Sequence, residues 1–169
     1  MFSDTFASFL LGLVPSAIAV VALYIEGRRN RIALQTELLL NLNEQMNSME
    51  MKRLRRKVAK NLIAKRKPNY ELGELLDFYS MVCYLYRCKA TNTDLLYNQF
   101  GWWIIRYWLC SKEWILNVRI DVDPDGWRNL ESVANEFLIR DAKDGHPQPS
   151  ENMLKRFLEL ETSLFFPGR

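Results

Sequence analysis

The sequence predicts an all-α protein made of an N-terminal transmembrane helix followed by a cytoplasmic helical bundle. Three observations predict this fold class. No charged residue occurs from Thr5 to Ile25, apolar residues then recur at spacings of three and four, and no stretch alternates with period two for long enough to form a sheet. The 169 residues, 49% of them hydrophobic, suffice for one modest domain and an appendage. We expect a transmembrane anchor at residues 1–27, a long basic amphipathic helix at 28–67 and the bundle at 68–169.

The uncharged run has the length of one membrane span. Its 21 residues, as an α-helix, rise about 31 Å, close to the thickness of a bilayer hydrocarbon core. A secretory signal peptide is the alternative, because Ala17-Ile18-Ala19 offers a small-residue cleavage pattern. Signal peptides begin with basic residues, however, and the only charge before this run is Asp4. We therefore expect an uncleaved anchor in a lipid bilayer.

Basic residues directly follow the span and predict its orientation. Arg28, Arg29 and Arg31 lie next to it, so the positive-inside rule places the N-terminus outside and the bulk of the chain in the cytoplasm. The three cysteines, an odd number at spacings unsuited to a disulfide framework, agree with a reduced compartment.

The charges that follow are unevenly distributed. Residues 52–67 hold nine Lys or Arg and no acid, whereas residues 68–169 hold 11 basic and 15 acidic residues. RNA, anionic headgroups or an acidic surface of a neighbouring subunit could pair with the basic segment, and a solvated helix face is the plain alternative. The candidate basic patch consists of Lys52, Arg53, Arg55, Arg56, Lys57 and Lys60. No known RNA-binding motif accompanies it.

Apolar stripes and helix breakers predict the helices of the bundle. Pro68 ends the long basic helix. The helices expected after it are one of about 18 residues, one starting between Thr91 and Asp94, a short one from about Ser111 to Arg119, one from Trp127 to about Arg140 and one capped by Ser150.

Most patterns that could carry chemistry are incomplete. Asp121, Asp123, Asp125 and Gly126 resemble the start of a calcium loop, but its twelfth position is Ser132 where a bidentate Glu is needed. A turn that caps the Trp127 helix is the better account. With one His and three Cys a zinc site lacks ligands, and neither a P-loop nor a GxSxG motif occurs. We predict no metal and no cofactor.

One pair of residues suits acid–base chemistry on RNA. Arg140 and His146, the single histidine, are separated by five residues. Histidine can move a proton to or from a ribose 2′-hydroxyl, and arginine can stabilise negative charge on the phosphate. The spacing resembles the R-x(4–6)-H motif of HEPN domains, all-α bundles that usually dimerise and, when active, cut RNA without a metal ion. Gly145 and Pro147 flank the histidine, so we expect it in a loop instead of on a helix, which argues against activity.

The layout of the whole chain resembles the small membrane-anchored accessory proteins of type VI-B CRISPR systems. The shared features are one span, a basic helical segment, an aromatic bundle and a divergent HEPN-like pair. The resemblance implies a homo-oligomer in the bacterial inner membrane that forms a pore and assists an RNA-guided RNA nuclease in antiphage defence. A wider bacterial family of single-span helical proteins has similar patterns at Leu76-Asp77-Phe78-Tyr79, Phe100-Gly101, Tyr107-Trp108 and Trp127 through Leu130-Glu131.

A stripe of small and polar residues runs along the predicted span. Thr5, Ser8, Gly12, Ser16 and Ala19 follow one another at helical spacings. Helices could pack closely along such a stripe or, in a wide ring, turn it toward water, and plain anchoring is the alternative. Two functions follow: an oligomeric pore-forming membrane protein, and a membrane-tethered HEPN-type ribonuclease that needs no metal. The 21 uncharged residues favour the first.

Overall fold

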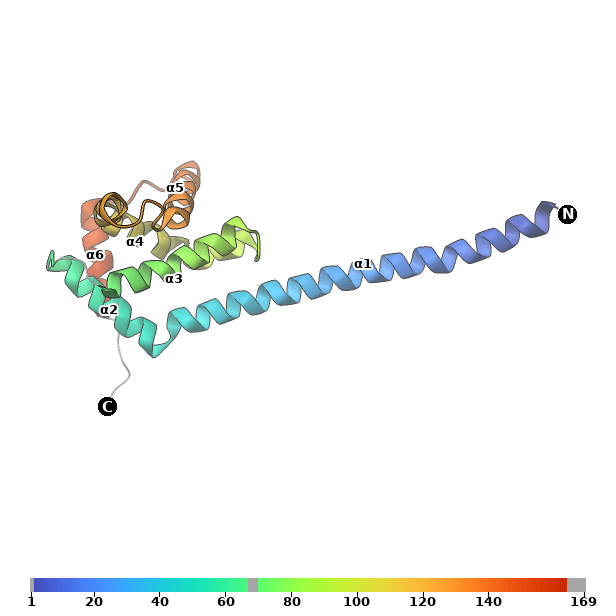
Figure 1. The fold of residues 1–169 in the computed structure, drawn as a ribbon, viewed down its shortest axis with the longest axis horizontal. Helices are drawn as coiled ribbons and strands as arrows, with labels where there is room; N and C mark the ends of the chain where they lie inside the picture. Colours follow the sequence, from blue (N-terminus) through green and yellow to red (C-terminus); the bar gives the residue numbers. More distant parts are fainter. Residues whose placement is uncertain (1, 67–69, 164–169) are drawn as a thin grey trace. The chain divides into compact units, whose positions relative to one another are not determined.

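The computed structural model describes residues 2–66 and 70–163, with the backbone alone at residues 2–21. The described part is all-α, which confirms the predicted class. The chain divides into two compact units, residues 1–38 and 39–169. The helices are α1 (Phe2–Asn47), α2 (Met49–Ile63), α3 (Tyr70–Arg87), α4 (Thr93–Asp121), α5 (Arg128–Lys143) and α6 (Glu151–Thr162) (Figure 1).

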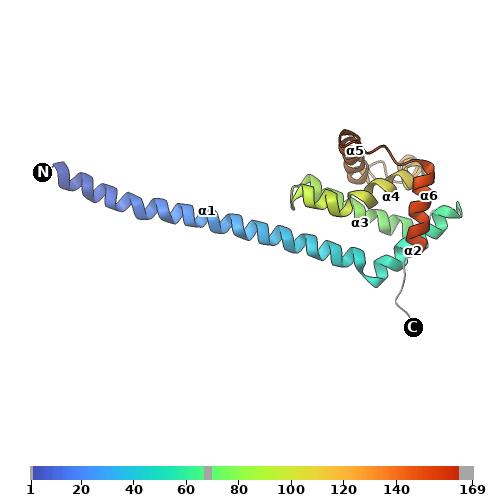
Figure 2. The ribbon, with the colours of Figure 1, turned by 180° about the vertical axis from the view of Figure 1, so that it is seen from behind.

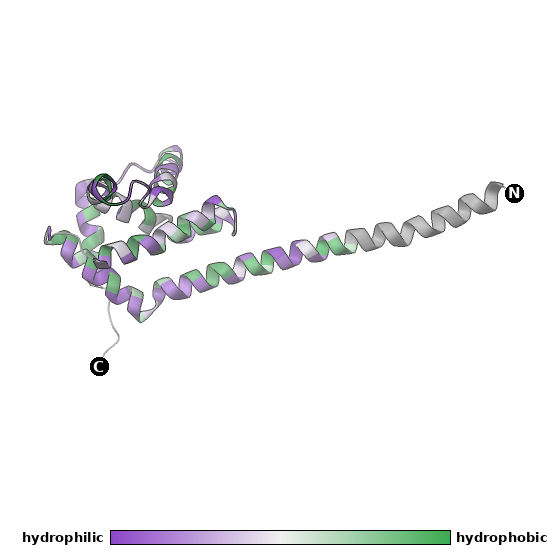
Figure 3. Ribbon diagram, in the orientation of Figure 1, coloured by the Kyte–Doolittle hydropathy of each residue, from purple (hydrophilic) through white to green (hydrophobic). Residues whose placement is uncertain are grey.

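The first unit is the amino-terminal part of α1. From residue 22 onward short apolar segments and short polar segments follow one another (Figure 3). The apolar side chains of Ile32 and Leu34 are exposed. Among residues whose side chains are described, no helix is both long and apolar enough to cross a bilayer. The stripe of small residues from Thr5 to Ala19, like most of the predicted anchor at 1–27, lies outside those residues.

The long basic helix expected at residues 28–67 is two helices, so that prediction is wrong. Helix α1 ends at Asn47 and α2 begins at Met49. Between them Ser48 has a ψ of 154°, outside the helical range, and its Oγ accepts a hydrogen bond of 3.1 Å from the backbone N–H of Met51. A serine in this position satisfies an amide that a new helix leaves unpaired, and therefore starts α2 in a new direction.

The prediction of a separate short helix from Ser111 to Arg119 is also wrong, because α4 continues without interruption to Asp121. The Ser111 hydroxyl is buried and donates a hydrogen bond to the carbonyl of Tyr107 one turn earlier. A serine whose hydroxyl is bonded within the helix cannot serve as a cap. Elsewhere the predictions hold: α3 has 18 residues, and Ser150 caps α6 by accepting from the N–H of Met153 at 3.4 Å.

In the second unit the helices α2–α6 gather around one core, as both views of the ribbon show (Figures 1 and 2). Helix α2 packs against α6 and α3, and α5 packs against α3 and α4. Aromatic rings join these helices: Tyr79 of α3 stacks on Tyr107 of α4 at 5.2 Å, and Tyr107 meets Phe157 of α6 edge-on at 5.0 Å. All three rings are almost fully buried.

A buried ion pair lies in the same core. Arg55 of α2 and Glu161 of α6 are each 3% exposed. The guanidinium is bidentate on the carboxylate, with Nε to Oε2 at 2.6 Å and Nη2 to Oε1 at 2.5 Å. The Tyr107 hydroxyl donates to Glu161 at 2.7 Å, and Trp103 Nε1 donates to it at 3.3 Å. Although burial alone would lower it, hydrogen bonding to Glu161 raises the pKa of Arg55, so the guanidinium stays charged.

We expect Arg55→Met to destabilise the protein by about 3–5 kcal/mol, because the substitution leaves the Glu161 carboxylate buried without its cation. Adding Glu161→Leu should restore most of the loss, since the pair is then replaced by apolar groups. Denaturant unfolding of the full chain, followed by tryptophan fluorescence, measures both effects.

The control is Lys57→Met, which removes a cation of the same helix whose ion pair with Glu71 is solvent-exposed. This control should lose far less stability than Arg55→Met. Equal losses in the two single variants would show that the buried pair has no special weight.

Candidate functional site

A surface pocket of about 560 Å³ lies between α4, α5 and the segment that joins α5 to α6. It brings together the two residues of the R-x(4–6)-H pattern, Arg140 and His146, which both line it. The other charged groups in its wall are Arg106, Asp141 and Asp144. The pocket therefore combines two guanidinium groups and an imidazole with two carboxylates.

The end of α5 determines where His146 lies. Gly145 has a φ of +82°, in the left-handed region that favours glycine. Its N–H bonds to the carbonyl of Ala142 at 3.3 Å, and the N–H of His146 bonds to the carbonyl of Asp141 at 2.8 Å. These two bonds form a Schellman motif, which ends α5 and holds the backbone of His146 one residue past the glycine. His146 is exposed and outside any helix, so the prediction that it lies in a loop is confirmed.

The guanidinium of Arg140 is held by two residues of α4. Its Nη1 forms an ion pair of 2.9 Å with Oδ1 of Asp94, and its Cζ lies 4.0 Å from the ring centroid of Tyr97. The hydrogen bond to Asp94 raises the pKa of Arg140. An anion that binds Arg140 must therefore compete with a carboxylate already bound to it.

Tyr97 and a further side chain of α4, Arg106, shape the pocket. The Tyr97 hydroxyl donates a hydrogen bond to Asp141, and burial together with this bond raises the pKa of Tyr97 to about 12. Arg106 lies 4.4 Å from the ring centroid of Trp102 and donates to the carbonyl of Trp102 at 3.0 Å. Burial lowers the pKa of Arg106. Two arginines stacked on aromatic rings thus face a cavity of ligand size.

Sequence analysis missed the residues of α4 around Arg140, although their helical spacing could have shown that they lie on one face. Asp94, Tyr97, Gly101 and Ile105 follow one another at intervals of three or four and therefore share a face. Gly101 has a structural reason, since a Cβ there would lie 3.0 Å from Cδ2 of Tyr97. The absent side chain lets the Tyr97 ring lie across the helix. No local pattern, however, links this face to Arg140.

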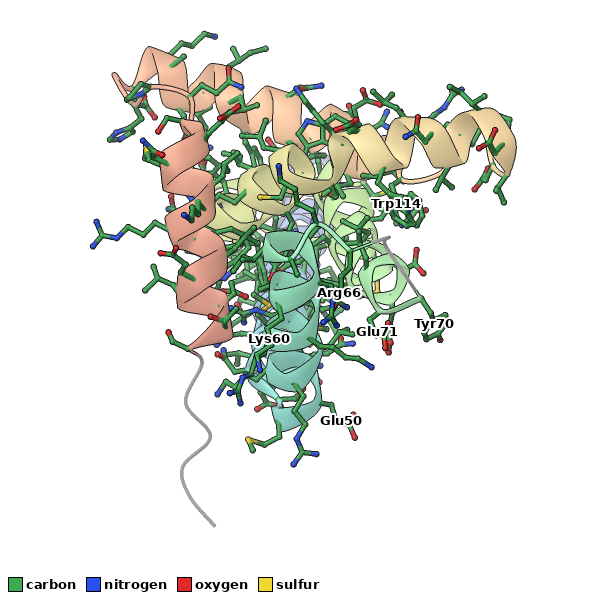
Figure 4. All side chains as sticks on the ribbon, turned by 90° about the vertical axis from the view of Figure 1, so that its left-hand side faces the viewer. Glu50, Lys60, Arg66, Tyr70, Glu71 and Trp114 are labelled. Atoms are coloured by element: carbon green, nitrogen blue, oxygen red, sulfur yellow. The ribbon has the colours of Figure 1, made fainter. Side chains whose placement is uncertain are left out.

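The candidate basic patch is only partly a surface. Arg55, one of its six members, is buried in the ion pair with Glu161, so its assignment to the patch is wrong. Lys57 pairs with Glu71 of α3. Arg53, Lys57 and Lys60 are exposed, whereas Lys52 and Arg56 are half-buried. Figure 4 shows Lys60 and Arg66 near the carboxyl half of α2, with Glu71 beside the helix.

The acidic segment before α5 forms a turn, as predicted, but the predicted cap is wrong, because no side-chain hydrogen bond caps α5 at Trp127, its N-cap residue. The N–H of Asp125 bonds to Oδ1 of Asp123 at 3.0 Å, and the N–H of Gly126 bonds to the Asp123 carbonyl at 3.1 Å. The Asp123 side chain is thus used within its own loop. Across the residues that the structure describes, no group of three or more His, Cys, Asp or Glu side chains is arranged to hold a metal ion.

Comparison with protein families assigns the chain to a group without a known activity. Residues 13–137 match the family described as a domain of unknown function, DUF4760, and the chain belongs to that family. No curated protein matches the chain, and no solved structure does. The family extends from the uncharged N-terminal run to the middle of α5, so it includes most of the bundle and ends before Arg140 and His146.

We expect Tyr97 to make stability depend on alkaline pH. Its pKa of about 12 in the folded chain lies above the ordinary value of 10, so its contribution is full below pH 10 and is lost as the pH rises toward 12. The free energy of unfolding should therefore fall more steeply over this range in the wild type than in Tyr97→Phe. Denaturant unfolding at several pH values measures the two slopes.

The matched control is Asp141→Asn, which keeps the phenol of Tyr97 but removes the carboxylate that accepts its hydrogen bond. This variant should show a slope between those of the wild type and Tyr97→Phe. Identical slopes in all three proteins would mean that the phenol titrates alike in the folded and unfolded chains.

Proposed function

We propose that this protein is a single-span membrane protein that assembles into an oligomer and forms a conductive path through its N-terminal segments. The observation that carries the proposal is the run of 21 uncharged residues from Thr5 to Ile25. A helical backbone through this run supports it, because a lone segment in lipid must satisfy its amides internally. Exposed Arg28 and Arg29 follow at once and favour a cytoplasmic bundle.

The proposed oligomer rests on the stripe from Thr5 to Ala19. Small residues at helical spacing allow helices to approach closely in lipid. One helix cannot enclose a channel, so conduction requires several copies of the chain, with the stripe turned toward the neighbours or the lumen. A role beside an RNA-guided nuclease in antiphage defence rests on the family resemblance alone and stays a prediction.

The second candidate function is a membrane-tethered ribonuclease. It is favoured by the pocket that Arg140 and His146 share, since an imidazole and a guanidinium around one cavity are the groups that metal-free RNA cleavage uses. The ion pair of Arg140 with Asp94 weighs against it, because the carboxylate offsets the positive charge that would stabilise a phosphate. We therefore rank the membrane function first.

The orientation of the anchor can be tested on a native cysteine. Cys88 is exposed, whereas Cys83 is buried and burial raises the pKa of half-buried Cys110 to about 12. A membrane-impermeant maleimide should therefore label Cys88 in inside-out membrane vesicles and leave it unlabelled in intact spheroplasts. The Cys88→Ser variant is the control for labelling elsewhere. Labelling of Cys88 from outside intact cells would reverse the topology.

The pore can be tested by adding bulk to the stripe. Gly12→Leu should keep the span in the membrane, because leucine is favourable in hydrocarbon, but should obstruct close packing or the lumen. We expect dye entry into expressing cells to fall while the amount of protein in the membrane fraction stays level. Leu11→Ile is the matched control at a neighbouring apolar position. Equal dye entry in the wild type, Gly12→Leu and cells without the protein would refute the pore.

The ribonuclease can be tested by releasing Arg140. We expect the purified wild-type chain to leave RNA uncut in the presence of a chelator. Asp94→Ala frees the guanidinium, and under the second candidate function RNA cleavage should then appear and be lost again by about 10²-fold or more in Asp94→Ala with His146→Ala. Metal-free cleavage by the wild type that His146→Ala abolishes would promote the ribonuclease above the pore.

A further inference from the structure

A second cavity has a more apolar wall than the Arg140 pocket. This groove of about 500 Å³ is lined by the carboxyl end of α2, by α4 and by the first turns of α6. Helices α2 and α6 pack against each other. Its aliphatic wall consists of Leu62, Ile63, Leu154 and Leu158, and the thiol of Cys110 also lines it. Ile63 is 40% exposed, so the wall is open to a ligand.

Two ammonium groups flank the aliphatic wall. Lys65 follows the end of α2 and Lys155 lies on α6, and both line the groove. The only carboxylate among the lining residues is that of Glu151, which leaves the groove with a net positive charge. The amino end of α6, where the helix dipole is positive, is at the same place.

Lys65 lies at the end of α2, where its N–H bonds to the carbonyl of Leu62 at 3.1 Å. Its φ is +49°, in the left-handed region. Helices commonly end in this conformation, and glycine is usually found there because it adopts it without strain. A lysine at this position carries a backbone cost that glycine would not.

We propose that this groove binds a single-chain anionic amphiphile, a long-chain carboxylate, with its hydrocarbon along Leu62, Ile63, Leu154 and Leu158 and its head group between Lys65 and Lys155. Ligand sites are mostly apolar with a few well-placed polar groups, and this groove has that composition. The hydrocarbon leaves water for an apolar wall, and the carboxylate gains charge-assisted hydrogen bonds. The inference goes beyond the proposed membrane function and does not rest on it.

Cys110 offers a readout for occupancy at the groove itself. In the full chain carrying Cys88→Ser, held in phosphatidylcholine nanodiscs, half-buried Cys110 is the thiol left to react, slowly and best at alkaline pH, because Cys83 is 0% exposed. Dodecanoate at ten times its Kd should slow maleimide labelling of Cys110 about tenfold, since about a tenth of the grooves are then empty. Dodecanol, which lacks the charge, and acetate, which lacks the chain, should each protect much less.

Two variants separate ligand binding from stability. Lys155→Glu should weaken protection by dodecanoate at least about tenfold, whereas Lys112→Glu, an exposed charge of α4 outside the groove, should not. Lys65→Gly removes the ammonium and relaxes the backbone, so it should weaken protection while raising the midpoint of unfolding. A merely structural lysine would change the midpoint without changing protection.

Four results would overturn the proposal. Dodecanol could protect as well as dodecanoate, or neither lysine variant could alter protection, in which case the head-group contacts do not exist. Full protection in phosphatidylglycerol nanodiscs without dodecanoate would assign the groove to a bilayer lipid. A drop in particle mass with Lys155→Glu would instead show that a second copy of the chain covers it.

Discussion

The ion pair between Arg55 and Glu161 constrains every helix around it. Removing two charges from water costs several kcal/mol for each ion, and hydrogen bonds of good geometry in the core must offset that cost. The bidentate contact between the two side chains supplies part of this compensation. Glu161 also accepts hydrogen bonds from Tyr107 and Trp103 of α4, and Nη1 of Arg55 donates to the backbone carbonyl of Met46 at 3.5 Å. If α2 slid by one residue against α6, both charges would be buried without a partner. The pair therefore excludes other registers of the bundle.

Helical periodicity was sufficient to predict the class and most of the helices, because the apolar stripes of α3, α5 and α6 face one core. Periodicity did not predict the roles of Ser48 and Ser111, because one serine starts a helix and the other lies within a continuous helix. The hydroxyl of Ser48 bonds to an amide ahead of it and starts a helix, whereas that of Ser111 bonds to a carbonyl behind it and lets the helix continue. Which bond forms depends on the packing around each serine.

Arg55 shows where local reasoning reaches its limit. Its spacing from Met51, Val58 and Ala59, at intervals of three and four, places it on the buried face of α2. The spacing alone could have predicted its burial. The carboxylate that makes burial tolerable lies 106 residues away, and no pattern near either residue links the two. The same holds for the Arg140 pocket, where Asp94 lies 46 residues before its partner.

The separation of Arg55 from Glu161 also has a consequence for synthesis. At about 5 to 20 residues per second, the 106 residues between them take roughly 5 to 20 seconds to translate. During that interval α2 has emerged, but its guanidinium has no carboxylate to meet, so it stays in water. The core around Tyr107 thus cannot close on α2 until α6 leaves the ribosome. Tyr79 and Tyr107, once synthesised, therefore stay without the contacts of α6 until the end of the chain has been made.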